Sequence, residues 1–460
     1  MDVIAAIATG GNPTAIGIVR VSGAGCFALC ERVFRAANGR AFGEQAPRKL
    51  VFGEMLDAAG RVVDQGLAVR FPGPGSFTGE DCAEFHCHGS PVVLRELLAS
   101  LFAAGARQAQ AGEFTKRAFL NGRLDLTQAE AVIDLIDAET AAAARNAAAQ
   151  LEGGLRRTLE PIQDALLEIT SRFYAVVDYP DEDIEDVRPA EIAASLRFAE
   201  EALARLLASC QRGKVLKSGV RTAIVGRPNA GKSSLLNALA GYERAIVTDI
   251  PGTTRDTVEE SVVCGGVLLR LTDTAGIRAT EDTVEKLGVE RSRRAVASAD
   301  LVIVLVDGTG GITAEDQEIL TLAQTAPHYI VAMSKSDLLP EGFAHILRQD
   351  KNARTPDAFL SLSSVTPGGL DLLEDAVAEI FPAGEPGEAG SLLTDQRQED
   401  AARRALEAVR RALEALESGL TPDAVLTDAE EALDALGELT GRTAREEIVS
   451  RIFSRFCVGK

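Results

Sequence analysis

The sequence predicts a multidomain protein of the α/β plus α class. We expect an α+β N-terminal domain, a discontinuous helical-bundle domain, and an inserted α/β domain with a mostly parallel sheet. The chain has 460 residues, enough for about three domains. Apolar residues make up 46% of it, enough to bury real cores. Two stretches with helical apolar spacing flank a segment in which strands alternate with helices.

Composition excludes several classes of protein. The net charge is −20, so nucleic acid would have to be bound by a local patch rather than by bulk charge. The sequence has no run of eighteen apolar residues, which argues against a membrane span. The opening MDVIAAIATGG lacks a basic segment and is expected to form a strand, not a signal peptide. Seven scattered cysteines, an odd number, indicate a reducing cytoplasm.

The N-terminal domain is expected over residues 1–120. Residues 16–21 and 66–71 are β-branched runs typical of strands, and the second leads into the turn sequence FPGPG. A helix is predicted over residues 91–104, because it begins with a proline after Ser90 and ends before Gly105.

The helical domain is expected in two pieces, residues 121–215 and 383–460. Neither piece alone could bury its apolar stripes well, so we interpret them as one domain interrupted by an inserted domain at residues 216–382. The connecting linkers are predicted at residues 211–218 and 382–390.

A phosphate-binding loop is predicted at the start of the inserted domain. A buried strand over residues 222–225 runs into GRPNAGKS, and a helix follows from Ser234. The glycines let backbone N–H groups face phosphates, Lys232 would contact the β and γ oxygens, and Ser233 would ligate Mg²⁺. A glycine-rich turn with an exposed lysine is the alternative, which the strand–loop–helix setting disfavours.

Two further motifs follow in the order a GTPase needs. The loop GTTRD would supply Thr254 as a second hydroxyl on Mg²⁺. The sequence DTAG follows a strand over residues 267–271, so Asp273 would lie near the metal and the Gly276 N–H near the γ-phosphate.

Recognition of guanine is expected from the sequence SKSD, after strands over residues 301–306 and 329–333. Asp337 can accept both N1–H and the exocyclic amine of guanine, which adenine does not offer. Ser334 replaces the usual asparagine, which weakens contact to the N7/O6 side of the base. Ser363, Ser364 and Val365 lie where a final base-contacting loop is expected.

At this point the sequence resembles a known family. GRPNAGKSS with DIPGTTRD resembles the Era-like branch of GTPases. The ending FCVGK, together with GIVRVSG, FTGED and GEFTKRAFLNGRLDL, resembles the MnmE (TrmE) family of tRNA-modification GTPases over essentially the whole chain.

The resemblance implies a GTPase that modifies carbon 5 of the wobble uridine 34 of tRNA, installing a carboxymethylaminomethyl-type group. It implies an N-terminal domain that binds 5-formyl-tetrahydrofolate or a related reduced folate and forms a homodimer. It also implies a heterotetramer with the flavoprotein MnmG. By resemblance, the folate contacts fall on Arg20, Glu84, Arg123 and Lys460, and Cys457 is a candidate reactive thiol.

Simpler interpretations of these residues remain open. Arg20 could be a surface strand terminus, and Glu84 could be a solvated strand residue. The sequence EFHCH, residues 84–88, suggests a metal site, but alternating residues of a strand face opposite sides, so we do not favour it. Cys457 could equally be a small buried hydrophobic residue.

Hydrolysis needs positive charge and a placed water, and Ile277 after Gly276 cannot orient one. The resemblance to potassium-activated family members implies K⁺ in place of an arginine finger, bound by Asn229, Thr248, Ile250 and Thr253. The family position for placing water falls on Glu285. The alternatives are that Asn229 only braces the loop and that Glu285 lies in a solvated acidic stretch. The resemblance also implies activation by pairing of G domains.

The expected site residues form three sets. The catalytic residues are Glu285, Lys232 and Asn229, and the Mg²⁺ ligands are Ser233 and Thr254. The nucleotide contacts are Asn229, Ala230, Gly231, Lys232, Ser233, Ser234, Thr248, Asp249, Ile250, Pro251, Gly252, Thr253, Thr254, Asp273, Thr274, Ala275, Gly276, Ser334, Lys335, Asp337, Ser363, Ser364 and Val365.

An alternative function is an Era-like regulatory GTPase that acts in ribosome assembly. Such a switch would be expected to carry a basic RNA-binding module, whereas residues 121–215 carry more acidic than basic side chains. Retention of reduced folate would distinguish the two functions.

Overall fold

The computed structural model describes residues 2–10, 12–178, 188–242, 260–272, 293–339, 354–382, 389–444, 446–454 and 456–459. The chain folds into two compact units, and each combines segments that are distant in sequence. Unit 1 comprises Met1–Ile133, Leu151–Arg197 and Arg404–Lys460, and unit 2 comprises Asp134–Gln150 and Phe198–Arg403.

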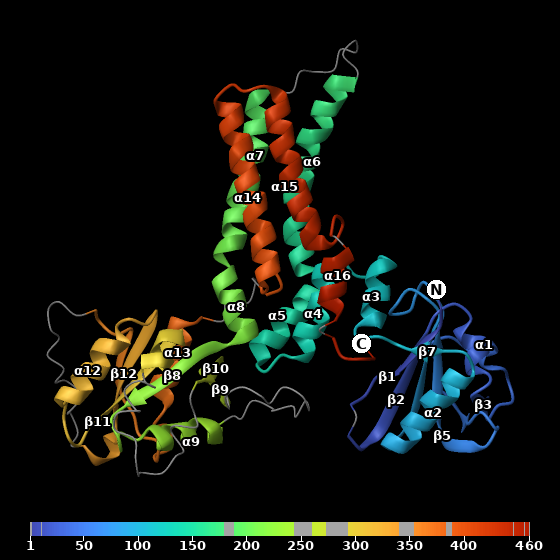
Figure 1. Ribbon diagram of the computed structural model, residues 1–460, viewed down its shortest axis with the longest axis horizontal. Coiled ribbons are helices and arrows are strands. Elements are labelled where there is room, and N and C mark those ends of the chain that lie inside the picture. Colours follow the sequence, from blue (N-terminus) through green and yellow to red (C-terminus); the bar gives the residue numbers. More distant parts are fainter. Residues whose placement is uncertain are drawn as a thin grey trace. The chain divides into compact units, whose positions relative to one another are not determined.

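A seven-stranded sheet forms the N-terminal part of unit 1 (Figure 1). Its order is β3-β4-β5-β6-β2-β1-β7, and neighbouring strands are antiparallel except for β1 and β7. The strands are β1 (Ile4–Ile7), β2 (Thr14–Ser22), β3 (Phe34–Ala36), β4 (Val51–Leu56), β5 (Val62–Phe71), β6 (Cys82–Gly89) and β7 (Arg107–Gln108). The strands predicted from the opening residues and at 16–21 and 66–71 are therefore confirmed.

One face of this sheet is covered by α2 (Pro91–Ala103), the helix predicted at residues 91–104. Leu94 and Leu97 of α2 share a buried core with Val19 of β2 and Phe85 of β6. The alternate residues of β2 and β6 face the other side of the sheet, where polar side chains gather. Short helices α1 (Cys26–Cys30), η1 (Phe42–Glu44) and α3 (Glu113–Leu120) complete this part.

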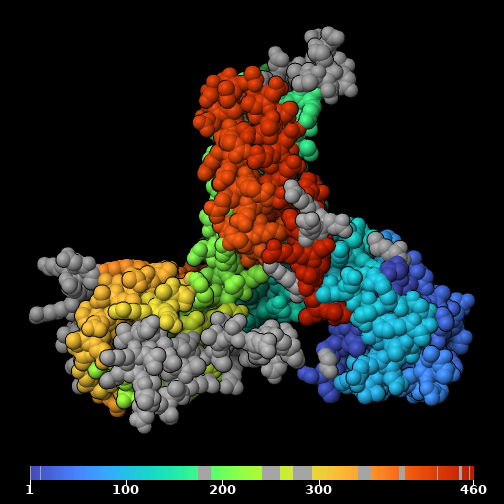
Figure 2. All heavy atoms as spheres, in the orientation of Figure 1, coloured from blue at the N-terminus to red at the C-terminus, as the bar shows by residue number. Residues whose placement is uncertain are grey.

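Eight further helices of different lengths belong to the helical part of the chain, counting only the described residues. They are α4 (Leu126–Ile136), α5 (Ala141–Leu151), α6 (Gly154–Asp178), α7 (Pro189–Ala208), α8 (Cys210–Ser218), α14 (Gln396–Glu417), α15 (Pro422–Thr440) and α16 (Glu446–Phe453). Within unit 1, α6 packs against α15, and Arg197 of α7 pairs with Glu417 of α14 at 2.9 Å. The space-filling view shows residues 404–440, in orange and red, packed into one continuous surface (Figure 2). Helices from both sides of the inserted segment therefore share one bundle, as expected.

Residues 211–218, predicted as a linker, are not an irregular connection: they form the helix α8. Gly213, inside this helix, has a packing role. A Cβ atom there would lie 2.0 Å from the carbonyl oxygen of Leu393, so the glycine lets two backbone segments of unit 2 approach closely.

A six-stranded sheet forms the centre of unit 2 (Figure 1). Its order is β13-β12-β11-β8-β10-β9, and only β9 and β10 are antiparallel, so the mostly parallel sheet is confirmed. The strands are β8 (Val220–Gly226), β9 (Glu260–Cys264), β10 (Val267–Leu271), β11 (Leu301–Asp307), β12 (His328–Ser334) and β13 (Ala358–Ser361).

Helices cover both faces of this parallel sheet. Leu301, Ile303 and Leu305 of β11 face a core shared with α9 (Lys232–Tyr242) and α13 (Asp371–Ile380). The intervening valines face a second core with α12 (Ala314–Ala323). The carboxyl ends of β8 and β12 lie on the same edge, where open α/β sheets bind ligands.

The described residues show two further properties, which concern membrane spans and cysteines. Among them, no helix has both the length and the apolar character needed to cross a bilayer. All seven cysteines are free thiols; six are buried, and Cys457 is exposed.

Candidate functional site

The phosphate loop connects β8 to α9 in unit 2. A Cβ atom at Gly226 would lie 2.4 Å from the carbonyl oxygen of Leu305, so only glycine fits where the loop leaves β8. Asn229 and Gly231 have φ values of 62° and 95°, in the left-handed region. The loop therefore makes left-handed turns just before the start of α9, which the glycine spacing of the motif predicts.

Lys232 folds back over this loop. Its Nζ donates to the carbonyl oxygens of Gly226 and Arg227, both at 2.7 Å. Burial lowers the pKa of Lys232, and nearby Glu315 partly opposes that shift. Phosphate oxygens would offer this ammonium group a charged partner in place of neutral carbonyls.

A buried ion pair braces the loop from the side. Arg227 donates from Nε to Asp316, whose side chain is only 1% exposed, at 2.8 Å. Asp316 also completes a capping box with Thr313 at the start of α12. Sequence analysis missed this brace; the T-x-x-D spacing at residues 313–316 was the available signal.

Ser334 joins the base-recognition segment to the phosphate loop. This side chain is buried, and its hydroxyl donates to the carbonyl oxygen of Ala230 at 2.7 Å, with the Val306 oxygen at 3.2 Å. These two contacts of its hydroxyl are with backbone oxygens of the phosphate loop and of β11, and the assignment of Ser334 to the nucleotide site stays a prediction.

The remaining base-recognition residues come together at the ends of β12 and β13. Ser363 Oγ donates to the Asp337 carboxylate at 2.7 Å, so the two predicted loops meet. Lys335, at φ 59°, pairs with Asp307 at 2.6 Å. Burial opposes the shift, but hydrogen bonds from Lys335 and Thr309 lower the pKa of Asp307 to about 2.

Two further predicted residues lie beside Ser363 in this neighbourhood. Val365 is exposed, and Ser364 is partly buried beside Ser363. The following lie outside the described residues: Thr248, Asp249, Ile250, Pro251, Gly252, Thr253, Thr254, Asp273, Thr274, Ala275, Gly276, Glu285 and Lys460.

A second polar group lies on the open face of the sheet in unit 1. Arg20 of β2 and Glu84 of β6 are direct cross-strand neighbours, and Arg20 Nε donates to Glu84 Oε1 at 2.9 Å. The Arg20 guanidinium lies 5.7 Å from the ring centres of both Phe77 and Phe114. Arg20 and Glu84 are both half-buried, which differs from a freely solvated strand terminus.

The C-terminal residues also lie against this N-terminal part. Val458 forms a β-bridge with Ala111, and a Cβ atom at Gly459 would lie 2.2 Å from the Ile7 carbonyl oxygen. Cys457 is exposed, so its interpretation as a buried hydrophobic residue is wrong. Arg123 is exposed and lies beside the loop at Gly79.

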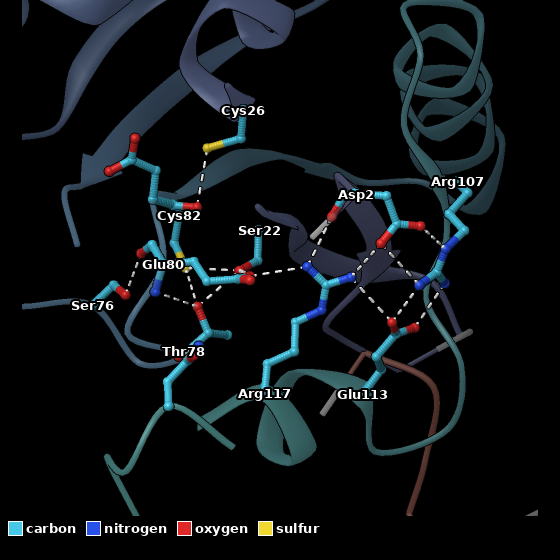
Figure 3. A network of polar contacts seen from close by, with 12 residues as sticks. Asp2, Ser22, Cys26, Ser76, Thr78, Glu80, Cys82, Arg107, Glu113 and Arg117 are labelled. Carbon is cyan, nitrogen blue, oxygen red and sulfur yellow. Dashed lines mark hydrogen bonds and ion pairs between the residues drawn. The ribbon is translucent and has the colours of Figure 1, made fainter. Parts of the chain in front are cut away.

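A network around Arg117 connects the N-terminus, the loop after β5 and α3 (Figure 3). The Arg117 side chain is 4% exposed and donates to Asp2, Glu80 and Glu113 at 2.8 to 3.1 Å. Burial acts to raise the pKa of Glu113, but hydrogen bonds from Arg107, the Gln110 N–H and Arg117 outweigh it and lower that pKa.

The same network reaches β2. Glu80 Oε2 accepts from the Ser22 hydroxyl at 2.9 Å, and Ser22 lies two residues from Arg20 on the same face. The i, i+4 spacing of Glu113 and Arg117 was the sequence signal for this network, which sequence analysis did not use.

The metal interpretation of residues 84–88 is not supported. Phe85 and Cys87 face the core, while Glu84, His86 and His88 face the other side. Within the described ranges, no group of three or more ligand-type side chains could hold a metal ion.

Comparisons with known proteins agree with this architecture. A family model described as GTP-binding protein TrmE N-terminus matches residues 3–123, and one described as MnmE helical domain matches residues 126–457. The chain is 45% identical to the tRNA modification GTPase MnmE of Symbiobacterium thermophilum, over 100% of this chain and 99% of that protein. It is 44% identical to the protein of the same name from Roseiflexus sp., with the same coverage.

Proposed function

The chain belongs to the MnmE family of tRNA modification GTPases, and on that premise we propose that its GTP hydrolysis drives modification of carbon 5 of wobble uridine 34 in tRNA. The product would carry a carboxymethylaminomethyl-type group whose one-carbon unit comes from a reduced folate. The observation that carries the proposal is that one chain contains both a phosphate loop, in unit 2, and the Arg20–Glu84 ion pair, in unit 1.

The proposed nucleotide site follows the sequence assignment. Residues 229–234 would bind the phosphates, with Ser233 in the first turn of α9 and Thr254 as Mg²⁺ ligands. Asp337, Lys335 and residues 363–365 would contact guanine. The Ser363–Asp337 hydrogen bond supports this, because it fixes the carboxylate that would accept from guanine N–H groups.

For hydrolysis we propose K⁺ at Asn229, Thr248, Ile250 and Thr253, with Glu285 placing the water. Of these, Asn229 lies in the described residues, and its left-handed backbone places it at the turn of the phosphate loop. Bound K⁺ would supply positive charge at the transferred phosphoryl group. We further propose that pairing of two G domains completes this arrangement.

The proposed folate site contains Arg20, Glu84, Arg123 and Lys460. The residues present fit such a ligand, because this part holds a half-buried charged pair, two aromatic rings and the buried Nε2 of His86, which has no hydrogen-bond partner among the described residues. The C-terminal segment beside Ala111 would bring Lys460 and the candidate thiol Cys457 towards the same part.

The proposed partners and boundaries extend the family assignment. We propose a homodimer, a complex with the flavoprotein MnmG, and a cytoplasmic location. The division into residues 1–120, 121–215, 216–382 and 383–460 remains a proposal, beside the two compact units seen in the fold. Ribosome assembly is the less supported function, since the relatives match over the whole chain.

Mass spectrometry of wobble uridines tests the proposal. Cells lacking this protein should lose the modified nucleoside, and wild-type protein should restore it. The Lys232→Ala variant should fail to restore it. Unchanged uridines together with accumulated ribosomal precursors would instead support the ribosome-assembly function.

A further inference from the structure

His86 is a polar side chain on the open face of the N-terminal sheet with no role so far. It lies on β6 between Glu84 and His88, and all three face away from the α2 core. His88 is exposed and pairs with Asp64 at 2.9 Å. His86 Nε2, in contrast, is buried and has no hydrogen-bond partner among the described residues.

The surroundings of His86 do not provide that partner. Its cross-strand neighbours are Ile18 on β2 and Leu67 on β5, both apolar. The nearest charged atom is Glu84 Oε2 at 3.4 Å, which is not in hydrogen-bond geometry. Buried polar atoms are almost always satisfied, so an orphan nitrogen beside a candidate site points to a missing ligand group.

We propose that His86 is a further ligand-contacting residue of the folate site, forming a hydrogen bond from Nε2 to the pterin ring edge beside Glu84. This inference rests on the folate site of the proposed function. A pterin edge presents an amine, a ring N–H and a carbonyl oxygen side by side. The Glu84 carboxylate accepts from the two donors, and His86 Nε2–H donates to the carbonyl.

The geometry assigns separate tasks to the neighbouring groups. Arg20 holds Glu84 Oε1, while the rings of Phe77 and Phe114 flank Arg20. Glu84 Oε2 is the oxygen on the side of His86. His86 thus extends the Arg20–Glu84 pair along the sheet by one polar group.

Calorimetric titration of the full-length protein with 5-formyl-tetrahydrofolate tests the contact. His86→Leu should weaken binding by about tenfold, the loss expected for one buried hydrogen bond, while His86→Gln should retain most of the affinity. His88→Leu is the matched control from the same face of β6 and should bind as the wild type does. Equal affinity of His86→Leu and wild type would overturn the assignment.

A second measurement follows His86 in the wild-type protein and uses a variant only to assign its signal. The chain has four histidines, so ¹⁵N-histidine labelling gives a simple spectrum in which His86→Gln identifies one signal. That signal should shift on addition of the folate, while the His88 signal stays. A stationary His86 signal with folate bound would refute the contact alone, whereas a wild type that binds no folate would refute the proposed folate site as well.

Discussion

The hydroxyl of Ser334 donates to the carbonyl oxygen of Ala230 at 2.7 Å, and so connects the end of β12 to the phosphate loop. Ser334 is buried and lies one residue before Lys335 and three residues before Asp337 in the base-recognition segment. The shape of the phosphate loop is therefore coupled to the segment that would contact the base. Position 334 stabilises the site through backbone contacts, whichever base is bound.

Ser334→Ala should weaken binding of guanine nucleotides by roughly fivefold, since one buried hydrogen bond is worth about 1 kcal/mol. The preference for GTP over ATP should persist, because Asp337 is untouched. Titration with fluorescent GDP and ADP analogues measures both quantities. Ser336→Ala is the neighbouring control and should bind normally. A lost base preference with unchanged affinity would show that Ser334 contacts the base instead.

Asp337→Ala should reduce the preference for GTP over ATP by at least about tenfold, since charge-assisted hydrogen bonds contribute about 1.5–3 kcal/mol. ATP affinity itself should change little. Competition between the two nucleotides for the same protein measures this ratio. If both affinities fell in parallel, Asp337 would have a structural role through Ser363 rather than a role in recognition.

GTP turnover should be faster in potassium than in sodium chloride at equal ionic strength. Asn229→Gly should remove that difference, because glycine tolerates the φ of 62° while the side-chain oxygen is lost. Steady-state phosphate release in both salts gives the result. If Asn229 only braces the loop, the variant should instead lose nucleotide affinity equally in both salts.

Arg117→Met should lower the free energy of unfolding of the N-terminal part by roughly 3–5 kcal/mol, because it removes the ion pair that the largely buried Glu80 carboxylate makes with Arg117. Arg35→Met removes an ion pair with Glu54 on the same sheet, where the arginine is 63% exposed, and should cost less than about 1 kcal/mol. Amide hydrogen exchange of β1 and β2 reports the local stability. Similar protection in the two variants would contradict the hub role of Arg117.

Asp307 should make nucleotide-free protein sensitive to acid. Its folded pKa of about 2 lies below the ordinary 3.8, so the unfolded state takes up protons first as the pH falls. The stabilisation, about 2 kcal/mol, is complete above pH 4 and is lost as the pH falls towards 2. Asp307→Asn should flatten this part of a calorimetric pH series. If the stability of the variant and of the wild type fell equally between pH 4 and pH 2, Asp307 would not be the cause of the acid sensitivity.

Elements with strong local signals could be predicted from the sequence. The strand–loop–helix at residues 220–242 and the helix begun by Pro91 follow from turn chemistry and periodicity, which act over a few residues. The helix at Cys210–Ser218 could not, since Gly213 argues locally for a break and only its packing on Leu393 explains it.

The candidate sites divide in the same way. The residues of the phosphate loop are adjacent in sequence, and their motif defines them. The Arg227–Asp316 pair joins residues 89 positions apart, and the Arg117 network joins residues 37 to 115 positions apart. Local patterns indicate a capping box at residues 313–316 and an i, i+4 pair at residues 113 and 117, but they do not identify the long-range partners, so tertiary structure was needed to find them.

Gly226 changes how mutational data at the phosphate motif should be interpreted. A methyl group there would collide with the Leu305 backbone of the adjacent strand before any nucleotide arrived. Inactivity of Gly226→Ala would therefore report a distorted sheet rather than a lost phosphate contact. The packing of the sheet itself requires the first glycine of the motif. Alanine substitutions can therefore identify phosphate contacts only at other positions of the motif.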